Sequence, residues 1–393
     1  MKVRISLAAM ALTALVAAGC GSSSSSTTTS ASAGSSTAAA SSGSSSKACT
    51  ASIGIEAPIT GQVAVLGDEQ LAFAELAVAA DNKANGTNIS LVQGDTQLNP
   101  AQATTVTQQF TSNSKIVGVV GPAGSQEVQA VGPLFGRAGL VFISGSATNP
   151  ALTTSGKNPT FFRVVSRDDV QGPEDANFVI KTLHPKALMI VDDQEVYSTG
   201  LVSSMLPVFQ KAGIKVDHES VSQKVTDFSS LVAKVSPQTT VVVLPWQVAA
   251  NGEQFGKDLQ QEHKNATIVG TDGMQSSSFT IPGSYVSAFG PDITAIPSDA
   301  ALVAAAKVKY PKFGTFGPPV YAATHVLDEA IASACKSGTP TRANVLAAVK
   351  STNESTSVLG QPITFDSKGD MVNAKWFLFH INSAGKYVLV TNS

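Results

Sequence analysis

Charged side chains are scarce in this sequence. They make up 14% of its 393 residues, the formal net charge is −2, and no run of Lys or Arg occurs. A protein that binds nucleic acid needs a clustered basic face, so no nucleic-acid partner is expected. Hydrophobic residues make up 43% of the chain, and its length suggests two or three domains, so a large core can form.

Long apolar runs are scarce as well. Residues 7–18 are mostly apolar, but this run is too short to cross a membrane as a helix. It follows Lys2 and Arg4 and precedes small residues, which is the layout of a secretory signal. The segment ends in AAGC, which resembles the bacterial lipoprotein box with Ala in place of its usual Leu. We therefore expect a lipoprotein signal peptide at 1–19 and a lipidated Cys20, with ordinary secretory cleavage as the alternative.

The segment that follows this cysteine has a very restricted composition. Residues 21–46 contain only Gly, Ser, Thr and Ala, which give the chain nothing to bury. We expect 20–46 to form the lipidated cysteine and a flexible tether, with an engineered linker as the alternative. The lipid would then be the only membrane attachment, and it would hold the protein on the outer face of the cell membrane.

Cysteine and histidine are also few, at three and five residues. Their positions match no metal-ligand spacing, so neither a metal ion nor another cofactor is expected. Beyond Cys20 only Cys49 and Cys335 remain, and in an exported protein two such cysteines can pair. We expect a disulfide that ties the start of the folded part to a late helix, and two buried free thiols are the alternative.

From Lys47 onward, strand-like apolar runs alternate with helical patterns. Strands that are almost entirely apolar indicate a parallel sheet with helices on both faces. The same alternation of strands and helices begins again near residue 186, which predicts two α/β units of similar size. The C-terminal pieces are too few for a third core and are expected to complete these units; they are helices at 318–337 and 341–351 and a hairpin within 362–382.

One turn between a strand and a helix carries candidate chemistry, VVGPAGSQEV at 119–128. A phosphate-binding P-loop needs Lys after its last Gly, and here Gly124-Ser125 is followed by Gln. A nucleophile elbow needs glycines two places before and after the serine, and Ala123 and Glu127 break that pattern. The free N–H groups and the dipole of a helix start still favour an anion. Ser125 is therefore a seat for a carboxylate or a plain helix cap.

A series of stretches in one order covers about 51–390 of the chain. The stretches are GIEAPITGQVAVLGDEQLAFAELAVAADN, VVGPAGSQEVQAVGPLFGRAGLVFISGSATNPALT, FFRVVSRDDVQGP, VDDQEVYSTGL, TDFSSLVAKV, VGTDGM, VYAATHVLDEAI and ITFDSKGDM. With these stretches the chain resembles a known family, the extracellular solute-binding proteins of ABC importers, of the leucine/isoleucine/valine-binding type.

This resemblance implies an α/β fold of two doubly wound parallel-sheet lobes, the periplasmic binding protein type I fold. Three crossing strands would join the lobes, which close on a ligand by hinge motion. The crossings are expected near 164–167, 289–296 and 359–365. Lobe 1 would then comprise 47–165 plus 295–358, and lobe 2 would comprise 166–294 plus 359–393.

The resemblance also implies binding residues on lobe 1. Ser125 and the amides around it, with Gly124, fall on the family's carboxylate-binding turn. Ser146 falls where a backbone carbonyl receives the ligand's ammonium, and Thr148 falls on a threonine that contacts both groups; a polar turn is the alternative for these two. Leu66 stands where the amino-acid binders carry a ligand-facing tyrosine. The identity of the ligand's side chain therefore stays open.

On lobe 2 the resemblance implies three more residues. Tyr197 matches a tyrosine that packs over the ligand, where its ring face favours an ammonium group. Asp272 matches an acidic position that pairs with that ammonium, and a turn residue in Asp-Gly is the alternative. Trp246 lies near a tyrosine that forms a wall of the pocket, and a plain core residue is the alternative.

Together these features imply a substrate-binding lipoprotein that captures a small amino-acid-like solute by hinge closure. It would deliver the solute to an ABC permease and its ATPase subunits, and a monomer is expected. No enzyme is expected, because no histidine accompanies Ser125. Two alternatives stay open: a ligand-sensing ectodomain that acts through a separate receptor, and import of another solute such as an amide or an aromatic acid.

Overall fold

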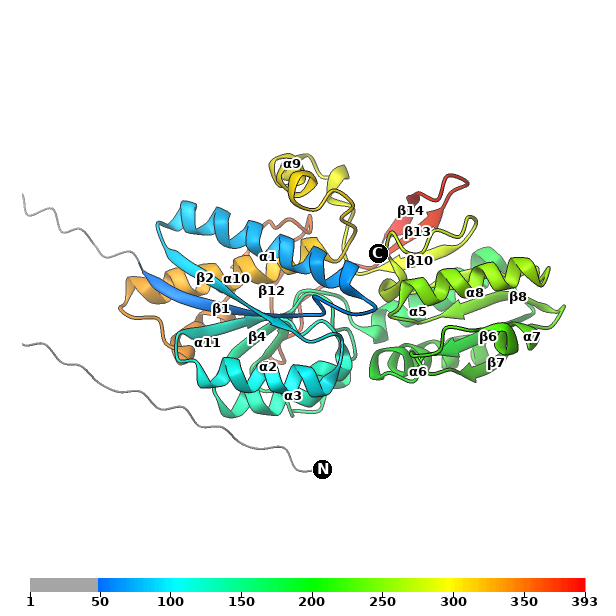
Figure 1. Ribbon diagram of the computed structural model, residues 1–393, viewed down its shortest axis with the longest axis horizontal. Helices are drawn as coiled ribbons and strands as arrows, with labels where there is room; N and C mark the ends of the chain where they lie inside the picture. The colour runs from blue at the N-terminus through cyan, green and yellow to red at the C-terminus, as the bar shows by residue number, and fades with distance from the viewer. Residues whose placement is uncertain (1–48, 393) are drawn as a thin grey trace, which may run out of the picture. The chain divides into compact units, whose positions relative to one another are not determined.

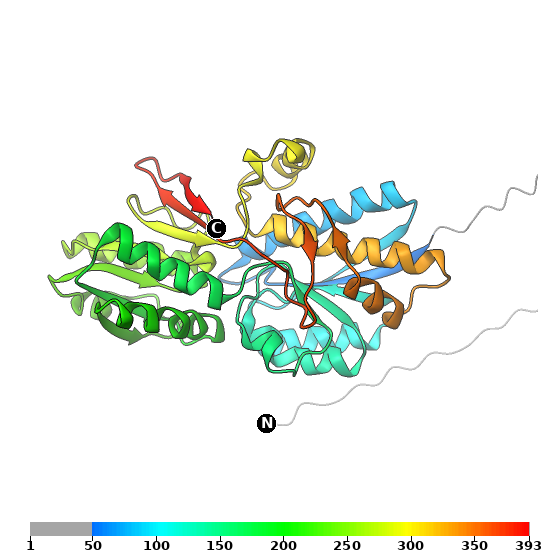
Figure 2. The same ribbon diagram turned by 180° about the vertical axis from the view of Figure 1, so that it is seen from behind.

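The computed structural model describes residues 49–392, so the expected signal peptide, Cys20 and the tether lie outside the described residues. The described part folds into two α/β lobes, each built on a mainly parallel sheet (Figures 1 and 2). The periodic apolar runs of the sequence therefore correspond to sheet cores, and the turns at the ends of their strands position the candidate site.

The first lobe contains a five-stranded parallel sheet in the order β2-β1-β3-β4-β5. Its strands are β1 Thr50–Ala57, β2 Asn88–Asp95, β3 Ile116–Val120, β4 Val141–Ser144 and β5 Phe161–Arg163. Its helices are α1 Ala64–Asn85, α2 Pro100–Ser112, α3 Ser125–Arg137, α4 Ala151–Thr154, α9 Ala300–Lys309, α10 Gly317–Lys336 and α11 Arg342–Lys350.

Helices cover both faces of this sheet, and the burial along β3 explains why its sequence is apolar throughout. Val117 and Val120 pack in a core with α1, α10 and α11, whereas Ile116 and Val119 pack in a second core with α2 and α3. Figure 1 shows these two groups of helices on opposite faces of the sheet. A strand buried on both faces gains nothing from alternating with polar residues.

The second lobe contains a seven-stranded sheet in the order β14-β13-β10-β9-β8-β6-β7. The strands β6 to β10 run parallel, and β13 and β14 add an antiparallel edge. The strands are β6 Ala187–Asp192, β7 Lys215–Ser220, β8 Thr239–Leu244, β9 Thr267–Gly270, β10 Tyr285–Ala288, β13 Phe377–Ile381 and β14 Tyr387–Asn392. Its helices are α5 Asp168–Phe178, α6 Val196–Lys211, α7 Ser229–Ala233 and α8 Ala249–Gln261.

The chain crosses between the lobes three times. It leaves β5 at Arg163 and enters α5 at Asp168, and it returns between Ala288 and Ile293, which packs with Phe73 of the first lobe. The third crossing differs from the expected 359–365. Leu359, Ile363 and Met371 are buried in the core of the first lobe, so the chain crosses only after Met371.

The expected single hairpin within 362–382 is also corrected. Its first part contains β12 Ile363–Thr364, which pairs antiparallel with the earlier strand β11 Asn353–Glu354. A tight turn follows at 366–370. Its second part is β13 of the other lobe, which pairs with β14 instead. Residues 377–381 are therefore a strand, but its partner strand lies further along the chain than the sequence suggested.

A disulfide joins Cys49, just before β1, to Cys335 near the end of α10, with 6.0 Å between their Cα atoms. The expected pairing is thus present in the structure, and it ties the first strand to a late helix.

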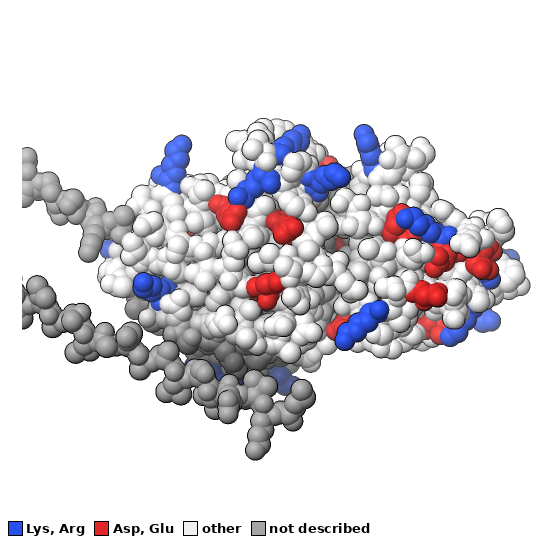
Figure 3. All heavy atoms as spheres, in the orientation of Figure 1, with Lys and Arg blue, Asp and Glu red and all other residues white. Residues whose placement is uncertain are grey.

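None of the helices in 49–392 is long and apolar enough to cross a membrane. On the face shown in Figure 3, acidic and basic side chains are interspersed.

Candidate ligand site between the two lobes

A cavity lies where strands of both sheets end at their carboxyl termini. Its volume is about 20 Å³, which is room for about one water molecule. The first lobe contributes an apolar wall, with Ser146 as its polar member; these residues are Leu66, Leu98, Ala123, Phe316 and Ser146. The second lobe contributes a polar wall of Tyr197, Gln247, Asp272 and Gly273. The expected residues Leu66, Ser146, Tyr197 and Asp272 are therefore brought together, although they span more than 200 positions of the sequence.

The turn after β3 and the turn after β4 are fixed to each other by hydroxyl groups. Ser144 Oγ donates to Pro122 O at 2.7 Å and accepts from Ala147 N at 3.0 Å. Ser146 Oγ donates to Ala123 O at 2.9 Å. These bonds hold the two turns rigidly, with the side chain of Ser146 at the cavity wall.

Ser125 is the first residue of α3, and the cap position belongs to Gly124. The side chain of Glu127 accepts from Gly124 N at 2.7 Å, so Ser125 is not needed as the cap. Its own Oγ accepts from Asn149 N at 3.3 Å, and the residue is 1% exposed. Ser125 thus borders the loop that carries Thr148, next to the cavity rather than on its wall.

Thr148 and Asp168 form a buried polar spot beside this loop. Both are fully buried, and among residues 49–392 neither Thr148 Oγ1 nor either carboxylate oxygen of Asp168 has a hydrogen-bond partner. Burial, together with the nearby charge of Asp272, raises the pKa of Asp168 to about 8. Asp168 was not among the expected site residues; the acidic pair that ends the SRDD segment, at the start of α5, was the sequence signal for it.

On the second lobe Tyr197 and Asp272 form one unit. Tyr197 Oη donates to Asp272 Oδ1 at 2.9 Å and accepts from Gly273 N at 3.0 Å. Gln171 Nε2 donates to the same Oδ1 at 2.6 Å. Burial raises the pKa of Asp272 to about 6, so the carboxylate is ionised at neutral pH. Two donors on one oxygen fix the orientation of the group at the cavity wall.

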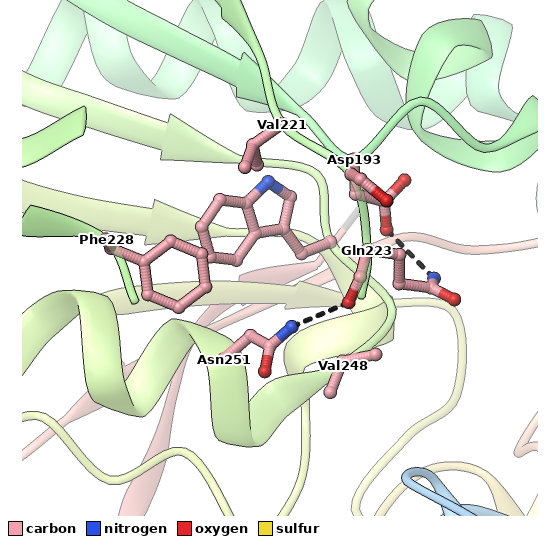
Figure 4. A pocket seen from close by; sticks show the side chains of 8 residues that line it. Asp193, Val221, Gln223, Phe228, Val248 and Asn251 are labelled. Atoms are coloured by element: carbon pink, nitrogen blue, oxygen red, sulfur yellow. Dashed lines mark hydrogen bonds between the residues drawn. The ribbon is translucent and has the colours of Figure 1, made fainter. Parts of the chain in front are cut away.

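Trp246 is placed elsewhere and corrects one expectation. Its ring packs against Phe228 and Phe255 in the core of the second lobe, and its Nε1 donates to Val191 O at 2.8 Å. The hollow beside it, seen in Figure 4 around Phe228 and Asn251, has no room for a water molecule. The next residue, Gln247, lines the ligand cavity instead. Successive side chains of an extended chain point in opposite directions, so a shift of one position moves a side chain from the core to the cavity.

Side-chain hydrogen bonds join the lobes across the cleft in this closed arrangement. Gln126 Nε2 donates to Gln247 Oε1 at 2.9 Å. Asn149 Nδ2 donates to Val196 O at 2.9 Å, and Thr315 N donates to the side chain of Gln275 at 3.3 Å. Gln247 is itself held by Gln223, which Figure 4 shows bonded to Asp193. The sequence did not predict these contacts, because a glutamine in a turn or helix gives no indication of which distant residue it bonds to.

Arg163 positions the loop that carries Thr148, and it was also missed. Its guanidinium donates to Ala147 O at 3.1 Å and to Asn149 O at 2.9 Å, and its Nε lies 2.6 Å from Asp370 Oδ1. The side chain is fully buried. Since Asp370 belongs to the turn before the third crossing, this ion pair couples the binding loop to the hinge region.

Two α/β lobes that enclose a polar cavity at the ends of their strands define the class of two-lobed ligand-binding proteins. The chain belongs to the periplasmic binding protein family, which it matches over residues 50–386. A Leu/Ile/Val-binding protein of Rhizobium johnstonii is 28% identical over 352 residues, covering 86% of this chain and 93% of the relative. A leucine-, isoleucine-, valine-, threonine- and alanine-binding protein of Pseudomonas aeruginosa is 28% identical over 340 residues, covering 83% and 88%.

Solved structures share the fold. The branched-chain amino acid transporter substrate-binding protein LivJ of Streptococcus pneumoniae, in complex with isoleucine, has a TM-score of 0.77 at 24% identity and covers 87% of this chain and 99% of its own. A solute-binding protein of Rhodopseudomonas palustris in complex with 3,4-dihydroxybenzoic acid has a TM-score of 0.76 at 17% identity, covering 88% and 97%. The two-lobed fold is thus that of the family.

Proposed function

We propose that this protein captures a small amino acid with an aliphatic side chain between its lobes and delivers it to an ABC importer. The observation that carries the proposal is the division of the cavity into two walls. Asp272 and Tyr197 form a polar wall on the second lobe, and Leu66, Leu98 and Phe316 form an apolar wall. The names of the curated relatives, which bind leucine, isoleucine and valine, support this class of ligand.

In this proposal the ligand's carboxylate binds at the start of α3. Ser125 Oγ and the first amides of the helix are donors there, and the positive end of the helix dipole favours an anion. No Lys or Arg lines the cavity. The donors are therefore neutral, which suits a carboxylate that is paired through its own ammonium rather than through a basic side chain.

The ammonium group is proposed to bind at the opposite wall. Asp272 of the second lobe supplies the negative charge, and Thr148 and the backbone carbonyl of Ser146 are proposed as further acceptors from the first lobe. The hydroxyl of Tyr197 orients Asp272 by its bond to Oδ1, which leaves Oδ2 for the ligand. A zwitterion held in this way bridges the two lobes, so its binding energy favours the closed arrangement.

The apolar wall would select the side chain. Leu66 provides a surface without a hydroxyl group, and Leu98 reaches the cavity from a backbone with φ of +56°, a conformation that a side-chain-bearing residue rarely adopts. Because the cavity volume in the closed arrangement is about 20 Å³, the lobes must move apart for any amino acid to enter. Small aliphatic ligands such as alanine and valine need the least movement.

Delivery is proposed to take place at the outer face of the membrane. Lipidated Cys20 would anchor a monomeric chain, and residues 21–46 would let the lobes reach a permease with its ATPase subunits. Lobe 1 would comprise 47–165 plus 295–371, and lobe 2 the remainder, with the last boundary moved to follow the core. The mass of the mature N-terminal peptide tests the lipid: an unmodified Cys20 contradicts the anchor.

A thermal-shift screen of the purified protein against amino acids, amides and aromatic acids tests the ligand class. We expect stabilisation by aliphatic amino acids and none by aromatic acids. Calorimetry with the best ligand should then give at least tenfold weaker binding for Ser125→Ala and for Asp272→Asn, with Ser203→Ala, an exposed change on α6, as the control. If the ligands that stabilise the protein lack an amine, the role of Asp272 is wrong.

A further inference from the structure

A second cluster of chemically active side chains lies in the first lobe, between α1 and α10. Asp81 comes from α1, and His325, Asp328 and Glu329 come from α10. The two helices pack along each other on one face of the first sheet (Figure 1). None of these residues lines the cavity between the lobes. The cluster therefore plays no part in the proposed ligand site.

The geometry of this cluster is close to that of a metal site. His325 Nδ1 lies 2.9 and 3.0 Å from the two carboxylate oxygens of Asp81. One ligand atom each from Asp81, His325 and Glu329 lies within 4.8 Å of the others. Ligand atoms around a tetrahedral ion with bonds of about 2.0–2.1 Å are about 3.3 Å apart, so a small rotation of the exposed Glu329 completes the set.

Asp328 gives an independent reason to expect a cation. It is fully buried, and neither of its carboxylate oxygens has a hydrogen-bond partner among the described residues. Its carboxyl group contacts that of Asp81. Two facing carboxylates in a buried place repel each other unless a proton or a metal cation lies between them.

The surroundings add negative charge and access from solvent. Burial raises the pKa of Glu354, the carboxyl that follows the cluster in β11, and its Oε2 also lacks a partner among residues 49–392. A surface cavity of about 300 Å³ is lined by His325 and Glu354, so an ion and its waters can reach the cluster. Asp299 lines the same cavity. The acidic side chains thus outnumber the single imidazole.

We propose that Asp81, His325 and Glu329, with Asp328 behind them, bind one divalent transition-metal cation such as Zn²⁺. An imidazole nitrogen combined with carboxylate oxygens favours Zn²⁺ over Ca²⁺ and Mg²⁺, which prefer oxygen ligands alone. The ion would join α1 to α10 and stabilise the first lobe. Because the carboxyl groups must be ionised and the imidazole neutral, binding would release protons.

Titration of the full chain with Zn²⁺ tests this site. The protein carries no polyhistidine tag and is first dialysed against EDTA. We expect one Zn²⁺ per chain by calorimetry, a thermal unfolding midpoint raised by a few degrees, and proton release that changes the heat between buffers. His325→Gln and Glu329→Gln should each weaken Zn²⁺ binding at least tenfold; Glu329 is exposed, so its replacement leaves the fold intact.

The control is His218→Gln, which removes a histidine that pairs with Asp192 but has no third ligand beside it within residues 49–392. It should bind Zn²⁺ as the unchanged protein does. Asp272→Asn should also bind Zn²⁺ normally while losing affinity for amino acids, which separates this proposal from the proposed function. The inference is overturned if Zn²⁺ does not bind, or if it binds His325→Gln and Glu329→Gln as tightly as the unchanged protein.

Discussion

At the scale of single residues, the site depends on carboxyl groups whose environments differ. Asp272 keeps a pKa of about 6 because two donors oppose the effect of its burial. For Asp168 the effect of burial outweighs that of the nearby Thr148 hydroxyl, and its pKa is raised to about 8. At neutral pH the first is an anion and the second keeps its proton. One negative charge therefore faces the cavity, which is what a single ammonium group needs.

This difference predicts how affinity depends on pH. Protonation of Asp272 removes the charge that pairs with the ammonium, so affinity for the amino acid should fall as the pH is lowered through about 6. Calorimetry at pH 7.5 and pH 5.0 should give about a tenfold loss for the unchanged protein. Asp272→Asn should bind weakly at both values. A pH-independent affinity of the unchanged protein would remove Asp272 from the ammonium site.

At the scale of elements, closure depends on how closely α6 approaches the loop after β4. Gly200 of α6 leaves no room for a methyl group, because a Cβ there would meet Asn149 Nδ2 of the other lobe and lie 2.8 Å from Asp168 Oδ2. The same loop accepts the bonds of Arg163 and donates to Val196 O at the start of α6. A glycine inside a helix is otherwise unfavourable, so its presence here fits a close contact between elements.

Gly200→Ala should therefore hinder closure without harming the helix. Alanine favours helix formation, so we expect equal or higher thermal stability but about tenfold weaker amino-acid binding. Small-angle scattering with ligand should give a larger radius of gyration than for the unchanged protein. Asn149→Ala in the same chain removes the clashing amide and should restore most of the affinity. Unchanged affinity in Gly200→Ala would show that the lobes close elsewhere.

At the scale of the whole molecule, buried acids decide how stability depends on pH. Burial raises the pKa of Glu69 and Glu127 to about 7, and that of Asp328 to about 8, whereas an unfolded chain holds carboxyl groups near 4. The folded protein thus binds more protons than the unfolded chain between about pH 4 and 8. Its free energy of unfolding must fall as the pH rises through that range.

We expect the thermal unfolding midpoint to drop by about 5 °C between pH 5.5 and pH 8.5, measured with EDTA present. His325 acts in the same direction, because Asp81 raises its pKa to about 9 and its stabilising charge is lost above that value. Asp328→Asn removes one titrating group and should flatten the slope. Although burial opposes it, Arg163 holds the pKa of Asp370 below its ordinary value, so stability should fall again in strong acid.

Much of this molecule follows from local sequence. Apolar runs such as IVGVV at 116–120 are strands because both faces of the sheet are covered by helices. Asn99-Pro100 begins a helix, since the Asn99 side chain accepts from Ala101 N and Gln102 N. The turn at 121–124 opens a helix at Ser125, as its sequence predicts. The family resemblance then placed Tyr197 and Asp272, two residues that no local pattern would have paired.

The sequence by itself determined the strands, the helices and the anion-favouring start of α3, because these depend on neighbours a few positions away. Only the tertiary structure decided that Gln247 rather than Trp246 reaches the cavity and that Gln126 bonds to it across 121 positions. It also decided that 359–371 stays with the first lobe and that Asp81 meets His325. Such contacts depend on side-chain direction and on the packing of distant elements, and one strand position or one helix turn is enough to change them.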